Sequence, residues 1–85
     1  MTYENFEANN LLLYSVLVRN ARFIDSLLDQ GANVNYQDHL GRAPLHIAYK
    51  HAQFENARQL IQRGASLELR DLAGRVPADY DTSLI

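Results

Sequence analysis

The sequence predicts an all-α protein built as a stacked array of short repeats. The first observation is that six residues recur, identical, at a single offset of 33 positions. Self-similarity at a fixed period of this size is typical of repeat proteins, in which each unit covers its neighbour. The second observation is that proline and glycine stand where the helices of each unit would begin and end. The six pairs are Asp38 and Asp71, Gly41 and Gly74, Arg42 and Arg75, Pro44 and Pro77, Gly31 and Gly64, and Ala32 and Ala65.

The best-preserved copy contains two predicted helices. Pro44 suits the first position of a helix over residues 44–52, because its fixed φ fits the first turn and its missing N–H would be unpaired there anyway. A second helix is expected over residues 54–63, ending at Gly64, where a left-handed backbone costs glycine little. The apolar residues of this second helix recur with helical spacing and predict one buried stripe. They are Phe54, Ala57, Leu60 and Ile61.

The first copy has the same shape. We expect helices over residues 11–20 and 21–30, followed by Gly31. Residues Asn5 to Asn10 carry no turn motif, so we expect them to form an N-terminal cap. The buried stripe of the second helix is predicted to comprise Ala21, Ile24, Leu27 and Leu28.

Projecting turns are predicted between the helix pairs. Val34 and Leu67 are single apolar residues among polar ones, which suits a short extended segment half-buried by its neighbour. The carboxylates of Asp38 and Asp71 can accept hydrogen bonds from backbone N–H groups two or three residues later. The glycines that follow them then supply the positive φ of a tight turn.

These residues carry a family resemblance. The segments DHLGRAPLHIA (residues 38–48) and LIQRGA (residues 60–65) resemble the ankyrin repeat, whose pattern is D-x-x-G-x-T-P-L-H-x-A-A through L-L-x-x-G-A-x-V-N, and LLDQGANVN (residues 27–35) matches its ending. The resemblance covers about residues 8–81. It implies an all-α, ankyrin-type helix-turn-helix solenoid with projecting β-turn or hairpin fingers. Its parts would be a capping repeat (1–37), a full repeat (38–70) and a truncated repeat (71–85).

The sequence departs from the family pattern at several points. Ala43 replaces the threonine that would cap the inner helix, a loss of about 1 kcal/mol. Ala52 and Gln53 stand where the family has Gly-His, and Asn56 takes a usually aliphatic position. In the third copy VPADYD (residues 76–81) replaces the TPLH segment.

No catalytic residue, cofactor or metal site is predicted, so we expect no enzyme. The chain has no cysteine, which excludes a disulfide framework, a thiolate zinc site and a cysteine nucleophile. His46 stands at a position where the family resemblance implies a structural, hydrogen-bonding imidazole. His39 and His51 have no second ligand at a recognisable metal spacing. Four acids are expected on a solvated face: Asp25, Asp29, Glu55 and Glu68.

Composition also narrows the partners and the compartment. The net charge of −2 argues against nucleic acid or a membrane surface as the main partner. The longest apolar run, residues 11–18, is too short to span a bilayer, and acids stand where a secretory signal needs basic residues. We therefore expect an intracellular, cytoplasmic protein, or one acting in the interior of a host cell if it is a viral or bacterial effector.

The resemblance implies a binding surface made of the fingertips and the concave face of the inner helices. Arginine beside isolated apolar anchors is typical of protein interfaces, so we expect a protein partner with an acidic patch. The alternative is that these loops are simply polar and tolerant of change. The predicted surface comprises Gln37, His39, Leu40, Arg42, Lys50, His51, Arg70, Leu72, Ala73 and Arg75, with Leu17 and Val18 at the N-terminal end.

The function predicted from these observations is a small non-catalytic adaptor or a stoichiometric inhibitor. The alternative is a structural unit that forms a homodimer through the unfinished C-terminal end. The initiating methionine favours an intact small protein over a piece of a longer array. Ser83, Leu84 and Ile85 fit the carboxyl ends that PDZ domains accept by strand addition, but we expect Leu84 and Ile85 to fold over the open end instead. There, together with Val76, Ala78 and Tyr80, they would cover Leu60, Ile61 and Leu67.

Overall fold

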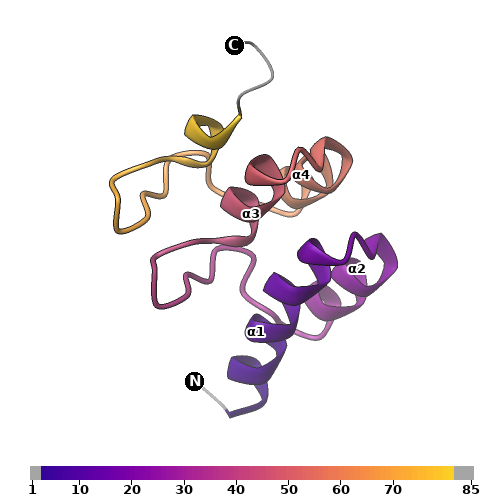
Figure 1. Cartoon of the computed structure of the whole chain (residues 1–85). Helices are drawn as coiled ribbons and strands as arrows, with labels where there is room; N and C mark the ends of the chain where they lie inside the picture. Colours follow the sequence, from indigo (N-terminus) through magenta and orange to yellow (C-terminus); the bar gives the residue numbers. More distant parts are fainter. Residues whose placement is uncertain (1–2, 82–85) are drawn as a thin grey trace.

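The helices form two columns that run from the N-terminal to the C-terminal end of the molecule. The computed structural model describes the backbone of residues 3–81 and the side chains of residues 7–81. Residues 3–81 form four α-helices and one 3-10 helix, with no strand. The inner column contains α1 (Tyr3–Leu17), α3 (Pro44–Lys50) and η1 (Pro77–Tyr80). The outer column contains α2 (Ala21–Asp29) and α4 (Phe54–Gln62), as Figure 1 shows. The predicted all-α fold is confirmed.

The N-terminal segment extends the first inner helix. Residues 5–10 form no finger, as expected, and they belong to α1. Asn9 of this segment is buried, and its Oδ1 accepts a hydrogen bond of 2.6 Å from the N–H of Asn33. The turn after α2 is thereby tied to α1. The side chain of Asn5 lies outside the described residues.

The core lies between the two columns. Its centre consists of apolar side chains from all four α-helices that are almost completely buried, which fits the helical spacing in the sequence. These side chains are Leu12 and Val16 from α1, Ile24 and Leu27 from α2, Leu45 and Ala48 from α3, and Ala57 and Leu60 from α4.

Three residues that were predicted to belong to the buried stripes of the outer helices are exposed. Ala21 is exposed, while Phe54 and Ile61 are 43% and 37% exposed, so Phe54 is not a core residue. Its ring instead meets that of Tyr49 edge-on, with centroids 6.1 Å apart. Asn56 is buried in the same helix, where its Nδ2 donates to Gln53 Oε1 at 2.6 Å.

For Ile61 the reason is that the described residues form no further outer helix above α4. Val34 packs against the core where the second repeat covers the first, but its counterpart Leu67 is 51% exposed. The 3-10 helix η1 packs on α3, not on α4. Residues 76–81 therefore leave Ile61 and Leu67 exposed, contrary to the expectation for Val76, Ala78 and Tyr80, although Leu60 is buried. Leu84 and Ile85 lie outside the described residues.

The outer helices are joined by an ion-pair cluster. The guanidinium of Arg63 lies 3.2 Å from Asp25 Oδ1 and 2.7 Å from Asp29 Oδ1. These two acids were expected on a plain solvated face, but they link the first repeat to the second. Gln59 makes a further link, since its Nε2 donates to the carbonyl oxygen of Ala21 at 2.8 Å.

The turn between the two helices of each repeat has a left-handed residue that is not glycine. Arg19 has a φ of 59° and Ala52 a φ of 56°, and the two residues are 33 positions apart. Ala52 stands where the ankyrin pattern has glycine. The glycines after the outer helices behave as predicted, with φ of 101° at Gly31 and 98° at Gly64.

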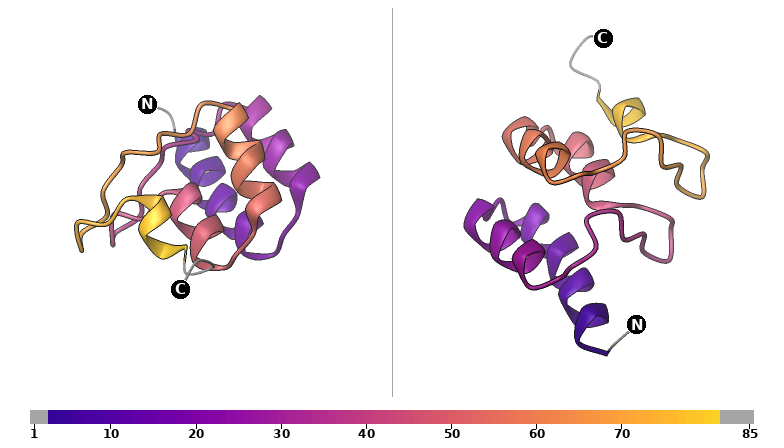
Figure 2. Two further views of the ribbon diagram at one scale, coloured as in Figure 1. Left: turned by 90° about the horizontal axis from the view of Figure 1, so that it is seen from above. Right: turned by 180° about the vertical axis from the view of Figure 1, so that it is seen from behind.

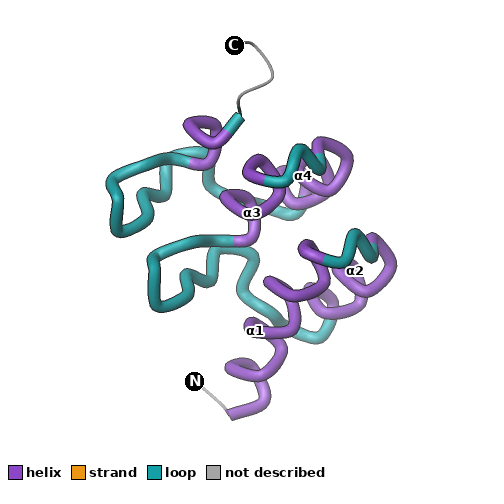
Figure 3. The backbone as a smooth tube through the Cα atoms, viewed as in Figure 1, coloured by secondary structure: helices purple, strands orange, loops and turns teal. Residues whose placement is uncertain are grey.

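Two fingers project from one edge of the stack, on the side opposite the outer helices. The views from above and from behind in Figure 2 show both fingers reaching away from α2 and α4. Figure 3 shows that the fingers are loops that join the end of one repeat to the inner helix of the next. No helix in the described part of the chain is long and apolar enough to cross a membrane.

Candidate binding surface at the fingers

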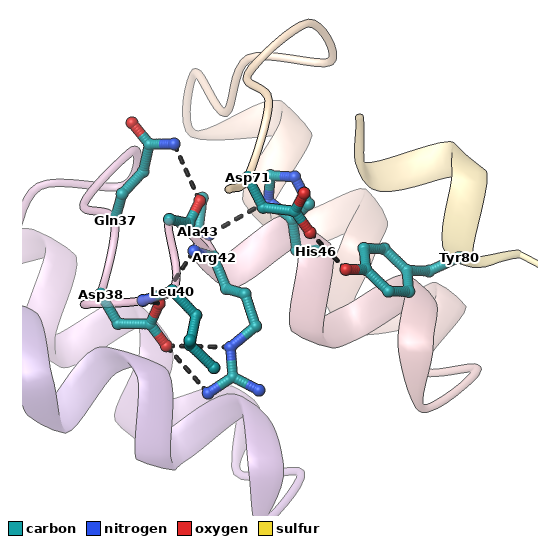
Figure 4. Close-up of polar contacts among 9 residues, drawn as sticks. Gln37, Asp38, Leu40, Arg42, Ala43, His46, Asp71 and Tyr80 are labelled. Carbon is teal, nitrogen blue, oxygen red and sulfur yellow. Dashed lines mark hydrogen bonds and ion pairs between the residues drawn. The ribbon is translucent and has the colours of Figure 1, made fainter. Parts of the chain in front are cut away.

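The first finger is organised around the carboxylate of Asp38. Its Oδ1 accepts hydrogen bonds from the N–H groups of Leu40 at 2.9 Å and Arg42 at 2.8 Å. Its Oδ2 lies 3.0 Å from Nε and 2.9 Å from Nη2 of Arg42 (Figure 4). The turn is completed by the Gly41 N–H, which donates to the Asp38 carbonyl oxygen at 2.8 Å. The charge of Arg42 is therefore engaged inside its own finger.

The second finger is organised in the same way around the carboxylate of Asp71, but its Oδ2 has a different hydrogen-bond partner. Oδ1 of Asp71 accepts from the N–H groups of Ala73 and Arg75, both at 3.0 Å. Its Oδ2 accepts from the hydroxyl of Tyr80 instead of from an arginine (Figure 4). The Arg75 guanidinium lies over the Tyr80 ring, 5.4 Å from its centroid. Arg42 and Arg75 thus occupy the same repeat position but differ in their contacts.

These contacts change the pKa values of the groups involved. At Asp38 burial acts to raise the pKa, but the hydrogen bonds from Arg42 and Leu40 outweigh it and hold the pKa below its usual value. At Asp71 the hydrogen bond from Tyr80, followed by that from the Arg75 N–H, lowers the pKa against the effect of burial. The same bond to Asp71, with burial, raises the pKa of Tyr80. Both fingers hold ionised carboxylates at neutral pH.

His46 joins the inner helix to the second finger, and its predicted structural role is confirmed. The ring is almost fully buried, and Nδ1 accepts a hydrogen bond of 3.0 Å from the Ala43 N–H. Nε2 lies 2.9 Å from the carbonyl oxygen of Arg75. With an acceptor role at Nδ1, the proton belongs on Nε2, which donates to that oxygen. Ala43 provides no side-chain cap, but His46 satisfies its N–H.

The two fingers are hydrogen-bonded to each other. The N–H of Leu72 donates to the carbonyl oxygen of Leu40 at 3.0 Å. The side-chain Nε2 of Gln37 donates both to the Gly41 carbonyl oxygen at 2.8 Å and to that of Arg70 at 3.0 Å. Backbone and side chain therefore hold the fingers in a fixed relative position.

A hollow of about 360 Å³ lies between the fingers and the inner helix. We call it the finger hollow. Its large apolar residues are both exposed, Leu40 at 45% and Leu72 at 76%. The ammonium of Lys50, at the end of α3, lies 5.9 Å from the Tyr80 ring centroid. The lining residues are Leu40, Arg42, Lys50, Asp71, Leu72, Ala73 and Tyr80.

The hollow brings together five of the twelve residues predicted for a binding surface. Of the others, Arg70 donates to the Gly74 carbonyl oxygen at 2.6 Å, and His39 and His51 are exposed outside the hollow. Leu17 and Val18 are exposed at the end of α1 and do not line it.

Sequence reasoning missed Asp71 and Tyr80 as residues of this surface. Asp71 was assigned only to the turn. Tyr80 belongs to the segment VPADYD, whose departure from the family pattern was the one available signal. In the described part of the chain, no group of three or more His, Cys, Asp or Glu residues could hold a metal ion.

Comparisons with known proteins agree with the geometry. The chain is 35% identical over 72 residues to the potassium channel GORK of Arabidopsis thaliana, covering 85% of this chain and 9% of the channel. It is 34% identical over 71 residues to inversin of Mus musculus, covering 84% of this chain and 7% of inversin. It is 35% identical over 72 residues to the 2-5A-dependent ribonuclease of Homo sapiens, covering 84% of this chain and 10% of the ribonuclease. The chain thus spans a tenth or less of these relatives. A family model described as ankyrin repeats, in three copies, matches residues 2–71. With its paired helices, its fingers and this match, the chain belongs to the ankyrin repeat family.

Proposed function

We propose that this chain is a non-catalytic adaptor or stoichiometric inhibitor that binds a partner protein through its fingers and the concave face of its inner helices. Ankyrin repeats are protein-interaction modules, generally without catalysis. The finer assignment is supported by one observation, the two exposed leucines on fingers that are bonded to each other, which line one hollow with Lys50 of α3. An intracellular, cytoplasmic setting accords with the absence of cysteine.

The apolar part of this surface supplies the anchors. Interfaces are held by a few apolar or aromatic side chains at their centre, surrounded by polar contacts that exclude water. Leu40 and Leu72 stand on neighbouring fingers and are both exposed. A partner that covers them removes apolar surface from water at about 25 cal/mol per Å². Its acidic groups would meet the cations of the same face and speed the encounter.

Two matched pairs of variants test the proposal. Leu40→Ala with Leu72→Ala removes the exposed leucines of the fingers, whereas Ile61→Ala with Leu67→Ala removes exposed aliphatic side chains from the C-terminal end. Each is used as bait in extracts of the native source, and captured proteins are compared by quantitative mass spectrometry. We expect the finger pair alone to lose the partner that the unaltered chain captures. Equal capture by the finger pair would contradict the proposal.

A second candidate function is self-association through the C-terminal end of the stack. The observation that favours it is the exposure of Ile61 and Leu67, which the described residues after them leave uncovered. Repeats bury such faces against neighbours, and a second copy is one possible neighbour. Sedimentation at rising concentration separates the two functions, since a dimer that Ile61→Ala with Leu67→Ala abolishes would favour this candidate. An adaptor of the kind proposed first stays monomeric without its partner.

A further inference from the structure

The two arginines at the same repeat position differ in how far their charge is available. The guanidinium of Arg42 is held by two hydrogen bonds to Asp38 Oδ2. The equivalent oxygen of Asp71 is occupied by the Tyr80 hydroxyl, so Arg75 is left over the face of the Tyr80 ring. Tyr80 therefore takes the place in the second finger that the arginine takes in the first.

Lys50 contacts the same tyrosine ring as Arg75. Its ammonium lies over the same ring as the guanidinium of Arg75, at 5.9 Å and 5.4 Å from the centroid. Among the described residues neither cation forms an ion pair with an acid. The carboxylate of Asp71 is turned inward, with both oxygens occupied by Tyr80 and by backbone N–H groups. Lys50 thus offers a cation in the lining of the finger hollow, Arg75 lies over the Tyr80 ring outside that lining, and the carboxylate of Asp71 is already bonded.

An apolar surface adjoins these cations. Leu40 and Leu72 border the hollow, each from a different finger. The volume of about 360 Å³ holds one or two side chains and is too small for a folded domain. An occupant that satisfies both halves of the site must present an aliphatic group and an anion close together.

We infer that the finger hollow binds an extended segment of the partner in which an aliphatic side chain stands within two residues of a carboxylate, and that Lys50 and Arg75 bind this carboxylate because Tyr80 keeps Asp71 from Arg75. This inference rests on the function proposed above and specifies its partner. Arg42 is a positioning residue of the first finger and takes no direct part. Tyr80 likewise acts through Arg75.

A random peptide library tests the chemistry of the occupant. Phage-displayed random dodecapeptides are selected against the full chain, and enriched sequences are synthesised with a fluorescent label for anisotropy titration. We expect enriched peptides to contain Asp or Glu within two residues of Leu, Ile, Val or Met. Enrichment of peptides without an acid, or no enrichment, would overturn the inference.

Charge variants with a matched control test the residues. Lys50→Glu with Arg75→Glu should raise the Kd of the selected peptides by on the order of tenfold or more. The control, Arg22→Glu with Arg58→Glu, makes the same changes in charge at exposed positions of α2 and α4 and should leave the Kd within about twofold. Equal losses in both double variants would mean that net charge alone matters, which contradicts a site at Lys50 and Arg75.

Tyr80→Phe tests the role of the hydroxyl without changing any charge. It keeps the ring beneath the two cations but frees Asp71 Oδ2, to which Arg75 can then bind as Arg42 binds Asp38. We expect weaker peptide binding, on the order of threefold, together with a shift of the Arg75 Nε–Hε resonance in NMR spectra. Folding is monitored by circular dichroism. An unchanged Arg75 resonance with unchanged affinity would refute the role of Tyr80.

Two further outcomes separate this inference from the proposed function. If Leu40→Ala with Leu72→Ala abolishes partner capture while the charge variants bind normally, the proposed function stands and the inference fails. If a chain ending at Asp81 binds the peptides more than tenfold more tightly than the full chain, its own C-terminal residues occupy the hollow and the inference of a partner segment fails as well.

Discussion

The imidazole Nε2 of His46 donates a hydrogen bond to the carbonyl oxygen of Arg75, 29 residues later and 2.9 Å away. The same ring accepts the Ala43 N–H through Nδ1. One buried side chain thus fixes the start of α3 and the end of the second finger. Tyr80 closes this arrangement, since its ring meets that of His46 edge-on with centroids 5.9 Å apart.

Replacing His46 by alanine should destabilise the protein strongly. The buried Ala43 N–H loses its partner, the Arg75 carbonyl oxygen keeps only the Asp71 N–H, and a cavity is left below Tyr80, so we expect a loss of about 2–4 kcal/mol in the free energy of unfolding. Urea denaturation followed by circular dichroism measures the change. His39→Ala, at an exposed fingertip, is the control and should change stability by less than about 0.5 kcal/mol. Equal effects of the two substitutions would show that the His46 bonds contribute nothing.

Glycine at position 52 should stabilise the protein. Ala52 has a φ of 56°, a left-handed conformation that costs a non-glycine residue about 1–2 kcal/mol. Part of that gain is offset because glycine is more flexible in the unfolded chain. We expect Ala52→Gly to raise stability by about 0.5–1 kcal/mol, detected as a higher Tm. Ala57→Gly is the matched control inside α4 and should lower the Tm. A lower Tm for Ala52→Gly would mean that the strain is absent.

Acid should weaken the fingers. The pKa values of Asp38 and Asp71 are lowered in the folded state, mainly through the hydrogen bonds that outweigh burial at Asp38 and through Tyr80 at Asp71. Such carboxylates contribute stability above the pKa of the unfolded chain, about 3.9, and lose it as the pH falls through the lower folded pKa. We therefore expect Asp38→Asn and Asp71→Asn to lower the Tm at neutral pH.

The difference between each of these variants and the unaltered chain should shrink below about pH 4. Thermal unfolding by circular dichroism, repeated from neutral to acid pH, follows this convergence. Glu68→Gln removes an exposed acid and should leave the Tm at neutral pH unchanged. If the Tm differences between the variants and the unaltered chain persisted undiminished in acid, the charge of these carboxylates would not be the source of their contribution to stability.

The two finger glycines should differ in their tolerance of a methyl group. Both have positive φ, 78° at Gly41 and 80° at Gly74, so alanine is strained at either position by about 1–2 kcal/mol. A Cβ at Gly41 would also lie 2.8 Å from the backbone nitrogen of Leu72 and 3.0 Å from the Cα of Asp71, whereas a Cβ at Gly74 meets no atom within 4 Å. Gly41→Ala should thus lower stability more than Gly74→Ala. Equal losses, measured by urea denaturation, would contradict the close approach of the fingers.

The parts of the fold that local stereochemistry determines could be predicted from the sequence. Pro44 begins α3, and Gly64 has the left-handed backbone that follows α4, because each residue type suits one backbone conformation. The exposure of Phe54 and Ile61 could not be predicted. Helical spacing identifies an apolar face, but it does not say whether a neighbouring layer covers that face.

The candidate site also contains features that could be predicted from the sequence and one that could not. The repeated D-x-x-G-R motif predicted two similar turns, and the structure contains them. The motif does not show that the two arginines differ in their contacts, because Tyr80 takes the place of Arg75 as the partner of Asp71. Such a difference arises from a tertiary contact with a segment outside the motif. It therefore cannot be predicted from the residues of the motif alone.

The hydrogen bonds of Gln37 have a consequence for any molecule that binds both fingers. Because Gln37 and the backbone bond between Leu72 and Leu40 join the loops, they behave as one preorganised body before any encounter. The conformational entropy lost on binding then falls mainly on the partner. A segment that is disordered when free would find a fixed template here, and its folding on contact would set the affinity.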